Sequence, residues 1–237
     1  MYTINDRVSF SRIGKDGKIG VAEMVNCLQD CALFHSEDIG HSAAFLAKRH
    51  RAWLVSAWDV VFVRRPEMGE RFLVHTWPYK MTNLFGHRNF LVETEEKEVL
   101  AYADSRWFYF DSENMKPARV DDDEKEVYKP EPAYDMDYSS RKILMPEALE
   151  TVDEVFVNHR YLDTNNHMNN GKYVEIAVGY IPVDFEVKEF RSEFRNAAKL
   201  GDSLQIKAGA KDGVFYVVYT DASGTPYFLS EFTPAGN

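Results

Sequence analysis

The sequence is poor in cysteine, lacks long apolar runs and carries no excess of positive charge. Its two cysteines, Cys27 and Cys31, lie about one helical turn apart, so we expect small core side chains in a reducing compartment rather than a disulfide framework. No stretch approaches the roughly 20 apolar residues of a membrane helix, and the first residues lack the apolar stretch of a signal peptide. We therefore expect a soluble, cytoplasmic protein.

The charge and the histidine spacing exclude further classes of protein. The 237 residues carry a net charge of −10, which argues against general nucleic-acid binding. His35, His41 and His50 lack the spacing of metal ligands and no His-Glu-x-x-His motif occurs, so a metal site is a weak option. The hydrophobic content of 45% and the aromatic content of 14% suit a sheet-rich protein with an apolar cavity.

The chain contains an internal repeat. Each half begins with a short strand, crosses a polar turn, enters a helix and continues as a run of strands. A shift of 148 residues superposes the apolar helical positions, Val25 on Tyr173, Leu28 on Ile176 and Ala32 on Tyr180. Pro182 is expected to end the second helix. Strands are predicted near residues 53–64, 71–80, 86–93 and 99–110, and again near 186–195, 203–210, 214–220 and 226–232.

Strands that follow one another without helical crossovers favour an antiparallel sheet wrapped round a helix. The predicted fold is therefore α+β, a tandem (double) hotdog in which two long helices are each wrapped by antiparallel strands of one continuous sheet. An unrelated α+β pair is the alternative. The N-terminal half is assigned to residues 1–125, a linker to 126–150 and the C-terminal half to 151–237. The acidic run at 121–124 is expected to be solvated.

The most unusual segment, residues 163–173, directly precedes the second helix. It brings together Asp163, Asn165 and His167 where the N–H groups and the dipole of a helix can stabilise a developing oxyanion. Asparagine and aspartate are also ordinary turn and N-cap residues, which is the structural alternative. The matching first-half segment, Lys15–Ile19, has no histidine. This asymmetry suggests that the second half carries the reaction.

A second candidate is Glu193, a carboxylate within an aromatic strand. Burial without a partner is costly, so Glu193 either faces solvent beside Arg191 and Arg195 or faces a site. Its first-half counterpart, at a shift of 132 residues, is Val61.

Together these motifs resemble those of the acyl-acyl carrier protein thioesterases. The second half matches the family's Asp-x-Asn-x-His motif, the following Asn-Asn-x-x-Tyr and a strand glutamate, at Asp163, Asn165, His167, Asn169, Asn170, Tyr173 and Glu193. The first half adds Arg64-Arg65-Pro66, Thr76-Trp77, Gly86-x-Arg88 and Ala103-x-Ser105-x-Trp107. Some plant members have a cysteine after the strand glutamate, whereas this chain has Phe194, which excludes a cysteine nucleophile there. The plant members also carry a transit peptide, which this sequence lacks, so the sequence looks like that of a bacterial member.

The resemblance implies hydrolysis of fatty acyl-acyl carrier protein to a free fatty acid and the free carrier, without a cofactor or metal. Glu193 would be the general base or, alternatively, a nucleophile, and Asn165 and His167 would hold the water and the reacting groups. Asp163 would orient its neighbours. The first half would form the acyl tunnel, with Met24, Leu28, Trp58 and Phe62 as the candidate lining residues, near Phe34 and Trp53.

The implied acidic carrier protein would dock on a basic patch. The candidates are Arg64, Arg65, Arg191 and Arg195, with Arg88 and Arg160 as further members. A fused pair of halves leaves both a monomer and a homodimer open. The alternative functions are an acyl-CoA thioesterase of the same fold and a non-catalytic acyl-binding regulatory module. Neither the acyl chain length nor the preference for unsaturation follows from the sequence.

Overall fold

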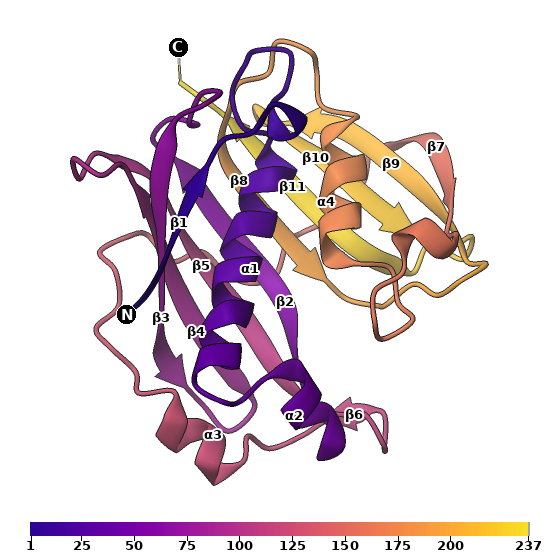
Figure 1. The fold of residues 1–237 in the computed structure, drawn as a ribbon. Coiled ribbons are helices and arrows are strands. Elements are labelled where there is room, and N and C mark those ends of the chain that lie inside the picture. Colours follow the sequence, from indigo (N-terminus) through magenta and orange to yellow (C-terminus); the bar gives the residue numbers. More distant parts are fainter. Residues whose placement is uncertain (237) are drawn as a thin grey trace. The chain divides into compact units, whose positions relative to one another are not determined.

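The computed structural model describes residues 1–236, which divide into two compact units (Figure 1). The first unit comprises Met1–Gly20 and Met24–Ser139. The second comprises Val21–Glu23 and the described residues from Ser140 onward. Each unit contains an antiparallel sheet and a helix that packs on one of its faces.

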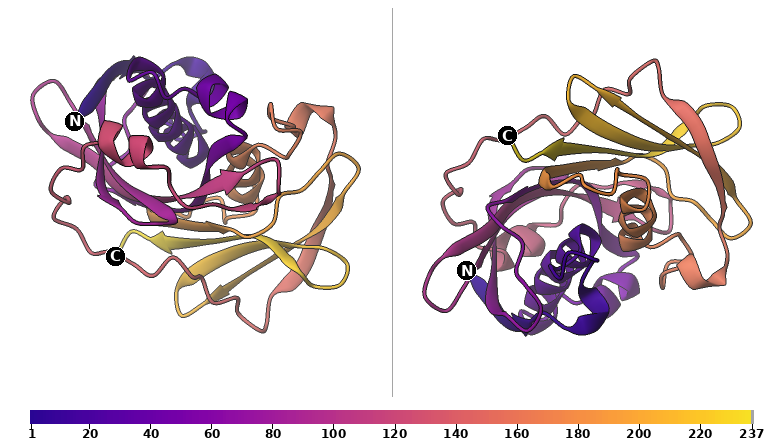
Figure 2. Two further views of the ribbon diagram at one scale, coloured as in Figure 1. Left: turned by 90° about the horizontal axis from the view of Figure 1, so that it is seen from below. Right: turned by 90° about the horizontal axis from the view of Figure 1, so that it is seen from above.

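The first unit has its sheet strands in the order β1 (Tyr2–Arg7), β3 (Arg71–Met81), β4 (Phe85–Glu93), β5 (Val99–Asp111) and β2 (Arg51–Phe62). All of these neighbours pair antiparallel, and the short strand β6 (Lys116–Pro117) pairs with β5. The other elements are η1 (Phe10–Arg12), α1 (Val21–Asp38), α2 (Ala43–Lys48) and α3 (Asp122–Val127). Figure 2 shows α1, in indigo, along one face of the purple strands in both views.

Helix α1 forms where the sequence provides an apolar stripe. Met24, Leu28 and Cys31, spaced by four and three residues, are at most 1% exposed. The thiol of Cys31 lies 3.4 Å from the carbonyl oxygen of Val74 in β3, so this stripe faces the sheet. Both cysteines are free thiols and are buried, as predicted.

The second unit has its strands in the order β8 (Val187–Phe194), β11 (Pro226–Pro234), β10 (Val214–Thr220), β9 (Ser203–Lys211) and β7 (Glu150–Phe156). These neighbours also pair antiparallel. Its helical elements are η2 (His159–Tyr161) and α4 (Asn170–Val178). Tyr173 anchors α4 on the sheet, with its ring 5.3 Å from that of Phe228 in β11 and 5.7 Å from that of Tyr219 in β10.

The internal repeat is present, but its predicted register is wrong by one residue. Helix α1 starts after the N-cap Gly20 and α4 after the N-cap Asn169, so the shift at the helices is 149 residues. Met24, not Val25, therefore corresponds to Tyr173. Helix α4 also has nine residues against eighteen in α1. It ends at Val178, before the C-cap Gly179 and not at Pro182 as predicted, because glycine is a poor helix former. Tyr180 therefore lies beyond the helix and donates a hydrogen bond to Asp153 at 2.6 Å.

The eight predicted long strands are confirmed within about two residues at each end, because runs of β-branched and aromatic residues bounded by turn residues are a local signal in the sequence. The short elements α2, α3 and β6 were not predicted. The acidic run is only partly solvated, since Glu124 in α3 is fully buried. Its carboxylate pairs with the imidazole of His41 and accepts a hydrogen bond from Trp53 Nε1 at 2.8 Å.

The segment between α3 and β7, residues 128–149, has no helix or strand, and Figure 2 shows it as an extended coil. The change from one compact unit to the other falls within it, between Ser139 and Ser140. Among residues 1–236, no helix combines the length and the apolar character needed to cross a membrane.

Candidate active site

Residues 163–168 form a tight turn that Asp163 holds together. The Asp163 N–H donates to the carbonyl oxygen of His167 at 2.8 Å, and the Asp163 carboxylate accepts from the N–H groups of Asn165 at 2.8 Å and His167 at 3.2 Å. Asn166 adopts a φ of 58°, a left-handed conformation that asparagine tolerates better than most residues. Asp163 therefore fixes the backbone from which Asn165 and His167 project.

The first half contains a turn with the same backbone. The Gly14 N–H donates to the carbonyl oxygen of Lys18 at 2.9 Å, and Gly17, at a φ of 74°, takes the place of Asn166. Isolated bridges close both turns, Ile13 to Ile19 and Leu162 to Met168. The shift of 149 residues thus puts Gly14, Asp16 and Lys18 at the positions of Asp163, Asn165 and His167.

The two turns differ in what their side chains do. In the first half, Asp16 forms an ion pair with Arg65, which also donates to the Ile19 carbonyl oxygen at 2.9 Å. The second half has Ala197 in place of Arg65, by the shift of 132 residues. Within residues 1–236, neither the side-chain amide of Asn165 nor the imidazole of His167 has a hydrogen-bond partner. These two groups are therefore available to an external molecule.

The start of α4 is held firmly beside this turn. The side chain of Asn169 accepts a hydrogen bond from the Gly171 N–H at 2.8 Å, and the Met168 N–H donates to the Ala198 carbonyl oxygen at 2.8 Å. The hydroxyl of Tyr173 in turn accepts from the Ala198 N–H at 2.9 Å. The turn is thus tied to the first turn of the helix, where the helix dipole favours developing negative charge.

Glu193 lies elsewhere in the second unit. Its carboxylate is 3% exposed and accepts hydrogen bonds from Arg195 Nη2 at 2.9 Å and from the Ile143 N–H at 3.0 Å. Arg141 Nη1 is 3.4 Å from its other oxygen. No hydrogen bond or ion pair within the described chain links Glu193 to Asp163, Asn165 or His167.

The strand geometry explains this separation. The neighbouring residue Phe194 packs its ring at 5.9 Å from Tyr173 of α4, so Phe194 faces the helix. Adjacent strand residues point to opposite faces, so Glu193 faces away from α4. Its register partner Leu229 lies on that outer face and packs with Ile143 of the linker. The prediction that Glu193 contacts Asn165 and His167 is therefore wrong for this structure.

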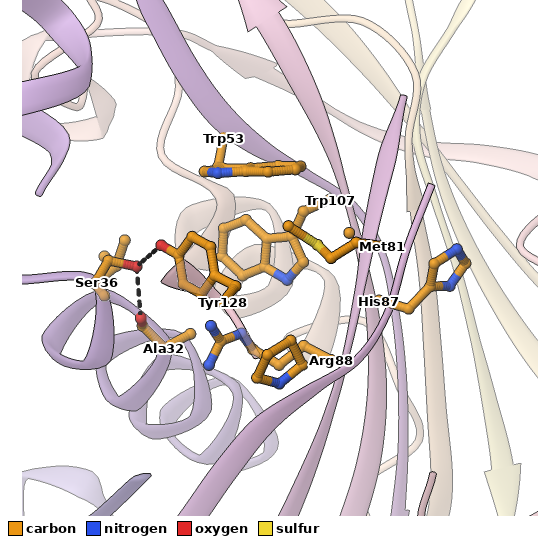
Figure 3. Close-up of a pocket in the computed structure, with 11 residues that line it drawn as sticks. Ala32, Ser36, Trp53, Met81, His87, Arg88, Trp107 and Tyr128 are labelled. Carbon is orange, nitrogen blue, oxygen red and sulfur yellow. Dashed lines mark hydrogen bonds between the residues drawn. The ribbon is translucent and has the colours of Figure 1, made fainter. Parts of the chain in front are cut away.

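The predicted tunnel residues are mostly ordinary core. Met24, Leu28, Trp58 and Phe62 are each at most 2% exposed, and none of them lines the cavity found in the first unit, while Phe34 is 49% exposed. That cavity encloses about 430 Å³, counting the space that opens to solvent. It lies between Ala32, Leu33 and Ser36 of α1 and the sheet, and its other lining side chains include Trp53, Met81, Arg88, Trp107 and Tyr128 (Figure 3).

The candidate docking arginines all pair with carboxylates of the chain. Arg64 contacts Glu70 at 2.6 Å and Glu98 at 2.7 Å, Arg65 contacts Asp16, Arg191 contacts Glu231, and Arg195 contacts Glu193. Arg160 is exposed, whereas Arg88 is 7% exposed and lines the cavity. Arg88 is thus removed from any docking surface.

Comparison with known proteins assigns the chain to a family. The model of the acyl-ACP thioesterase N-terminal domain matches residues 1–128, and that of the C-terminal domain matches residues 146–220. The chain therefore belongs to the acyl-ACP thioesterase family. A chloroplastic acyl-[acyl-carrier-protein] hydrolase of Cuphea viscosissima is 25% identical over 187 residues, which are 73% of this chain and 45% of that protein. The chain spans about half the length of the curated relatives it matches.

Solved structures show the same fold. An acyl-ACP thioesterase from Bacteroides thetaiotaomicron superposes with a TM-score of 0.88 at 22% identity, over 98% of this chain and 96% of that chain. The 12:0-ACP thioesterase from Umbellularia californica gives a TM-score of 0.87 at 18% identity, over 99% and 97% of the two chains. The predicted double hotdog fold is confirmed.

Proposed function

We propose that the chain hydrolyses the thioester of a fatty acyl-acyl carrier protein to a free fatty acid and the carrier's thiol. The observation that carries this proposal is the contrast between the two turns. The same backbone geometry occurs in both turns. In the first turn Arg65 pairs with Asp16, whereas in the second the amide of Asn165 and the imidazole of His167 have no hydrogen-bond partner among the described residues. Family membership and the names of the curated relatives support the substrate class.

In this mechanism His167 acts as the general base. Its imidazole takes a proton from water while the water oxygen attacks the acyl carbon. The C–S bond then breaks, and the imidazolium returns the proton to the departing thiolate. Asn165 holds the water or the thioester oxygen by hydrogen bonds, and Asp163 is a positioning residue that keeps the turn closed. No metal or cofactor takes part in these steps.

The first unit provides the cavity for the acyl chain. Its walls combine the rings of Trp53, Trp107 and Tyr128 with Met81 and Leu33, which suits a flexible hydrocarbon. The carrier protein docks on basic side chains for which Arg64, Arg65, Arg191 and Arg195 stay the candidates. Because each of them already pairs with a carboxylate, we expect the salt dependence of kcat/KM to be modest.

The test compares His167→Ala with Lys18→Ala, the change at the corresponding position of the first-half turn. Both side chains are half-buried in turns of the same geometry, so both variants are expected to fold. Thiol release from acyl-carrier protein should fall by roughly 10²–10⁴ in His167→Ala and stay near the wild-type rate in Lys18→Ala. Near-normal turnover by His167→Ala would remove the turn from the mechanism.

Carrier protein and coenzyme A are separated by a second measurement. Turnover of one acyl chain on the two carriers should favour the carrier protein, because a protein partner adds contacts that coenzyme A lacks. Faster hydrolysis of the CoA thioester would assign the chain to acyl-CoA hydrolysis instead.

A further inference from the structure

Arg88 is a buried cation in the wall of the first unit's cavity. It is 7% exposed and, among residues 1–236, no carboxylate pairs with it. Its Nη1 donates to His35 Nδ1 at 3.0 Å and to Thr76 Oγ1 at 3.2 Å, and its guanidinium lies 5.6 Å from the ring centre of Tyr128. A buried charge without a counter-ion is costly, so its retention calls for an explanation.

The neighbouring groups supply no negative charge. Burial and the adjacent guanidinium lower the pKa of His35 to about 4, so its imidazole is neutral at pH 7 and accepts the hydrogen bond from Arg88. Thr76 and Tyr128 are neutral hydroxyl groups. Burial also lowers the pKa of Arg88 itself, the direction expected for an uncompensated cation.

Arg88 keeps donors for a further partner. A guanidinium has five N–H groups, and the two on Nη1 are used by His35 and Thr76. No hydrogen bond within the described chain involves Nε or Nη2, which carry the other three. Figure 3 shows the guanidinium among the cavity side chains, close to Tyr128, whereas the ring of His87 points away from them.

The surrounding contacts hold this arrangement in place. Thr76 Oγ1 donates to the Asn89 carbonyl oxygen at 3.0 Å, which leaves its lone pairs for Arg88. The hydroxyls of Tyr128 and Ser36 are 2.6 Å apart, and Ser36 donates to the Ala32 carbonyl oxygen. The cavity therefore presents fixed donors within a largely aromatic wall, at a low cost of reorganisation.

We propose that this cavity selects acyl chains that carry an oxygen acceptor, as a hydroxyl, oxo or carboxyl group, and that Arg88 donates to that oxygen. The proposal rests on the proposed function, since it names the subclass of acyl substrate. A plain hydrocarbon would displace water from the guanidinium without replacing its hydrogen bonds, whereas an oxygenated chain would satisfy them.

The test uses acyl-carrier proteins of one chain length, one with a plain saturated chain and others with a hydroxyl at successive positions. Wild-type protein should prefer at least one hydroxylated chain in kcat/KM. Arg88→Met should lower the ratio of kcat/KM for that chain to kcat/KM for the plain chain by roughly 10- to 100-fold. Arg88→Lys, which keeps the charge, should retain part of the preference. A loss of the same factor on both chains in Arg88→Met would overturn the proposal.

A binding measurement separates this inference from the proposed function. Trp53 and Trp107 line the cavity, so their fluorescence reports binding of S-alkyl pantetheine thioethers, which carry no carboxyl group, with a hydroxylated or a plain alkyl chain. If no acyl-carrier protein is hydrolysed, the proposed function fails, but tighter binding of the hydroxylated thioether that Arg88→Met abolishes would still support the cavity's selectivity. Equal affinity for both thioethers in the wild-type protein would refute it.

Discussion

Glu193→Gln should lower the thermal stability of the protein far more than its rate of thioester hydrolysis. The glutamine can still accept from the Ile143 N–H, but the charge-assisted bond from Arg195 at 2.9 Å is lost, at about 1.5–3 kcal/mol. The pair with the more exposed Arg141, at 3.4 Å, adds less than about 1 kcal/mol. A total of about 1.5–4 kcal/mol corresponds to a fall in Tm of roughly 3–16 °C for a chain of this size.

Two assays separate the two roles of this residue. Thermal unfolding followed by circular dichroism measures the loss of stability, and thiol release at a temperature where the variant is folded measures turnover. We expect turnover per folded molecule to fall less than tenfold, against the 10²–10⁴ expected for loss of a positioned base.

Glu231→Gln is the matched control. Glu231 pairs with Arg191 on the same outer face, but its side chain is 13% exposed against 3% for Glu193, so a smaller loss of stability is expected. The reasoning is refuted if Glu193→Gln keeps the wild-type Tm and loses at least 100-fold in turnover. The carboxylate would then take part in the reaction.

Two further changes test the first unit. Burial raises the pKa of Asp104 to about 6, above its usual value near 4. The folded state therefore binds the proton more tightly than the unfolded state, and the free energy of unfolding that this contributes is fully present below pH 4 and is lost as the pH rises through 6. Asp104→Asn, which keeps an acceptor for the Tyr79 hydroxyl, should gain up to about 3 kcal/mol at pH 7 and little at pH 4; an equal gain in Tm at both pH values would contradict this. A Cβ on Gly86 would lie 3.1 Å from Met81 Sδ and 3.4 Å from the Trp53 ring. Gly86→Ala should therefore narrow the cavity and shift the released fatty acids towards shorter chains, and an unchanged product profile would separate this cavity from chain selection.

Much of the fold was predictable because runs of β-branched and aromatic residues bounded by turn residues are a local signal of strands. The side to which Glu193 points was also within reach of the sequence. Phe190, Ser192 and Phe194 alternate with Arg191, Glu193 and Arg195, which predicts that Glu193 shares a face with the arginines rather than with the aromatic rings. The same alternation places Arg88 on one face with Gly86 and Phe90.

Other features depend on contacts that are remote in sequence. The register between the halves is set by the turn hydrogen bonds at Gly14 and Asp163, which the helical pattern alone does not reveal. The burial of Glu124 requires His41 and Trp53, more than 70 residues away. The cavity likewise arises where side chains of α1 and the sheet leave space. An apolar residue that the sequence predicts to be buried, such as Trp58, therefore need not line the cavity.

The two halves show how one backbone can serve structure in one copy and chemistry in the other. In the first turn Arg65 neutralises Asp16 and binds the Ile19 carbonyl oxygen, so the polar side chain is fully used within the protein. Replacement of that arginine by Ala197, and of the turn residues by Asn165 and His167, removes the internal partners without changing the backbone hydrogen bonds. Polar groups that stay unpaired on a rigid turn lose little freedom when a substrate binds, which is the condition for strong transition-state contacts. The second turn meets this condition, and the first does not.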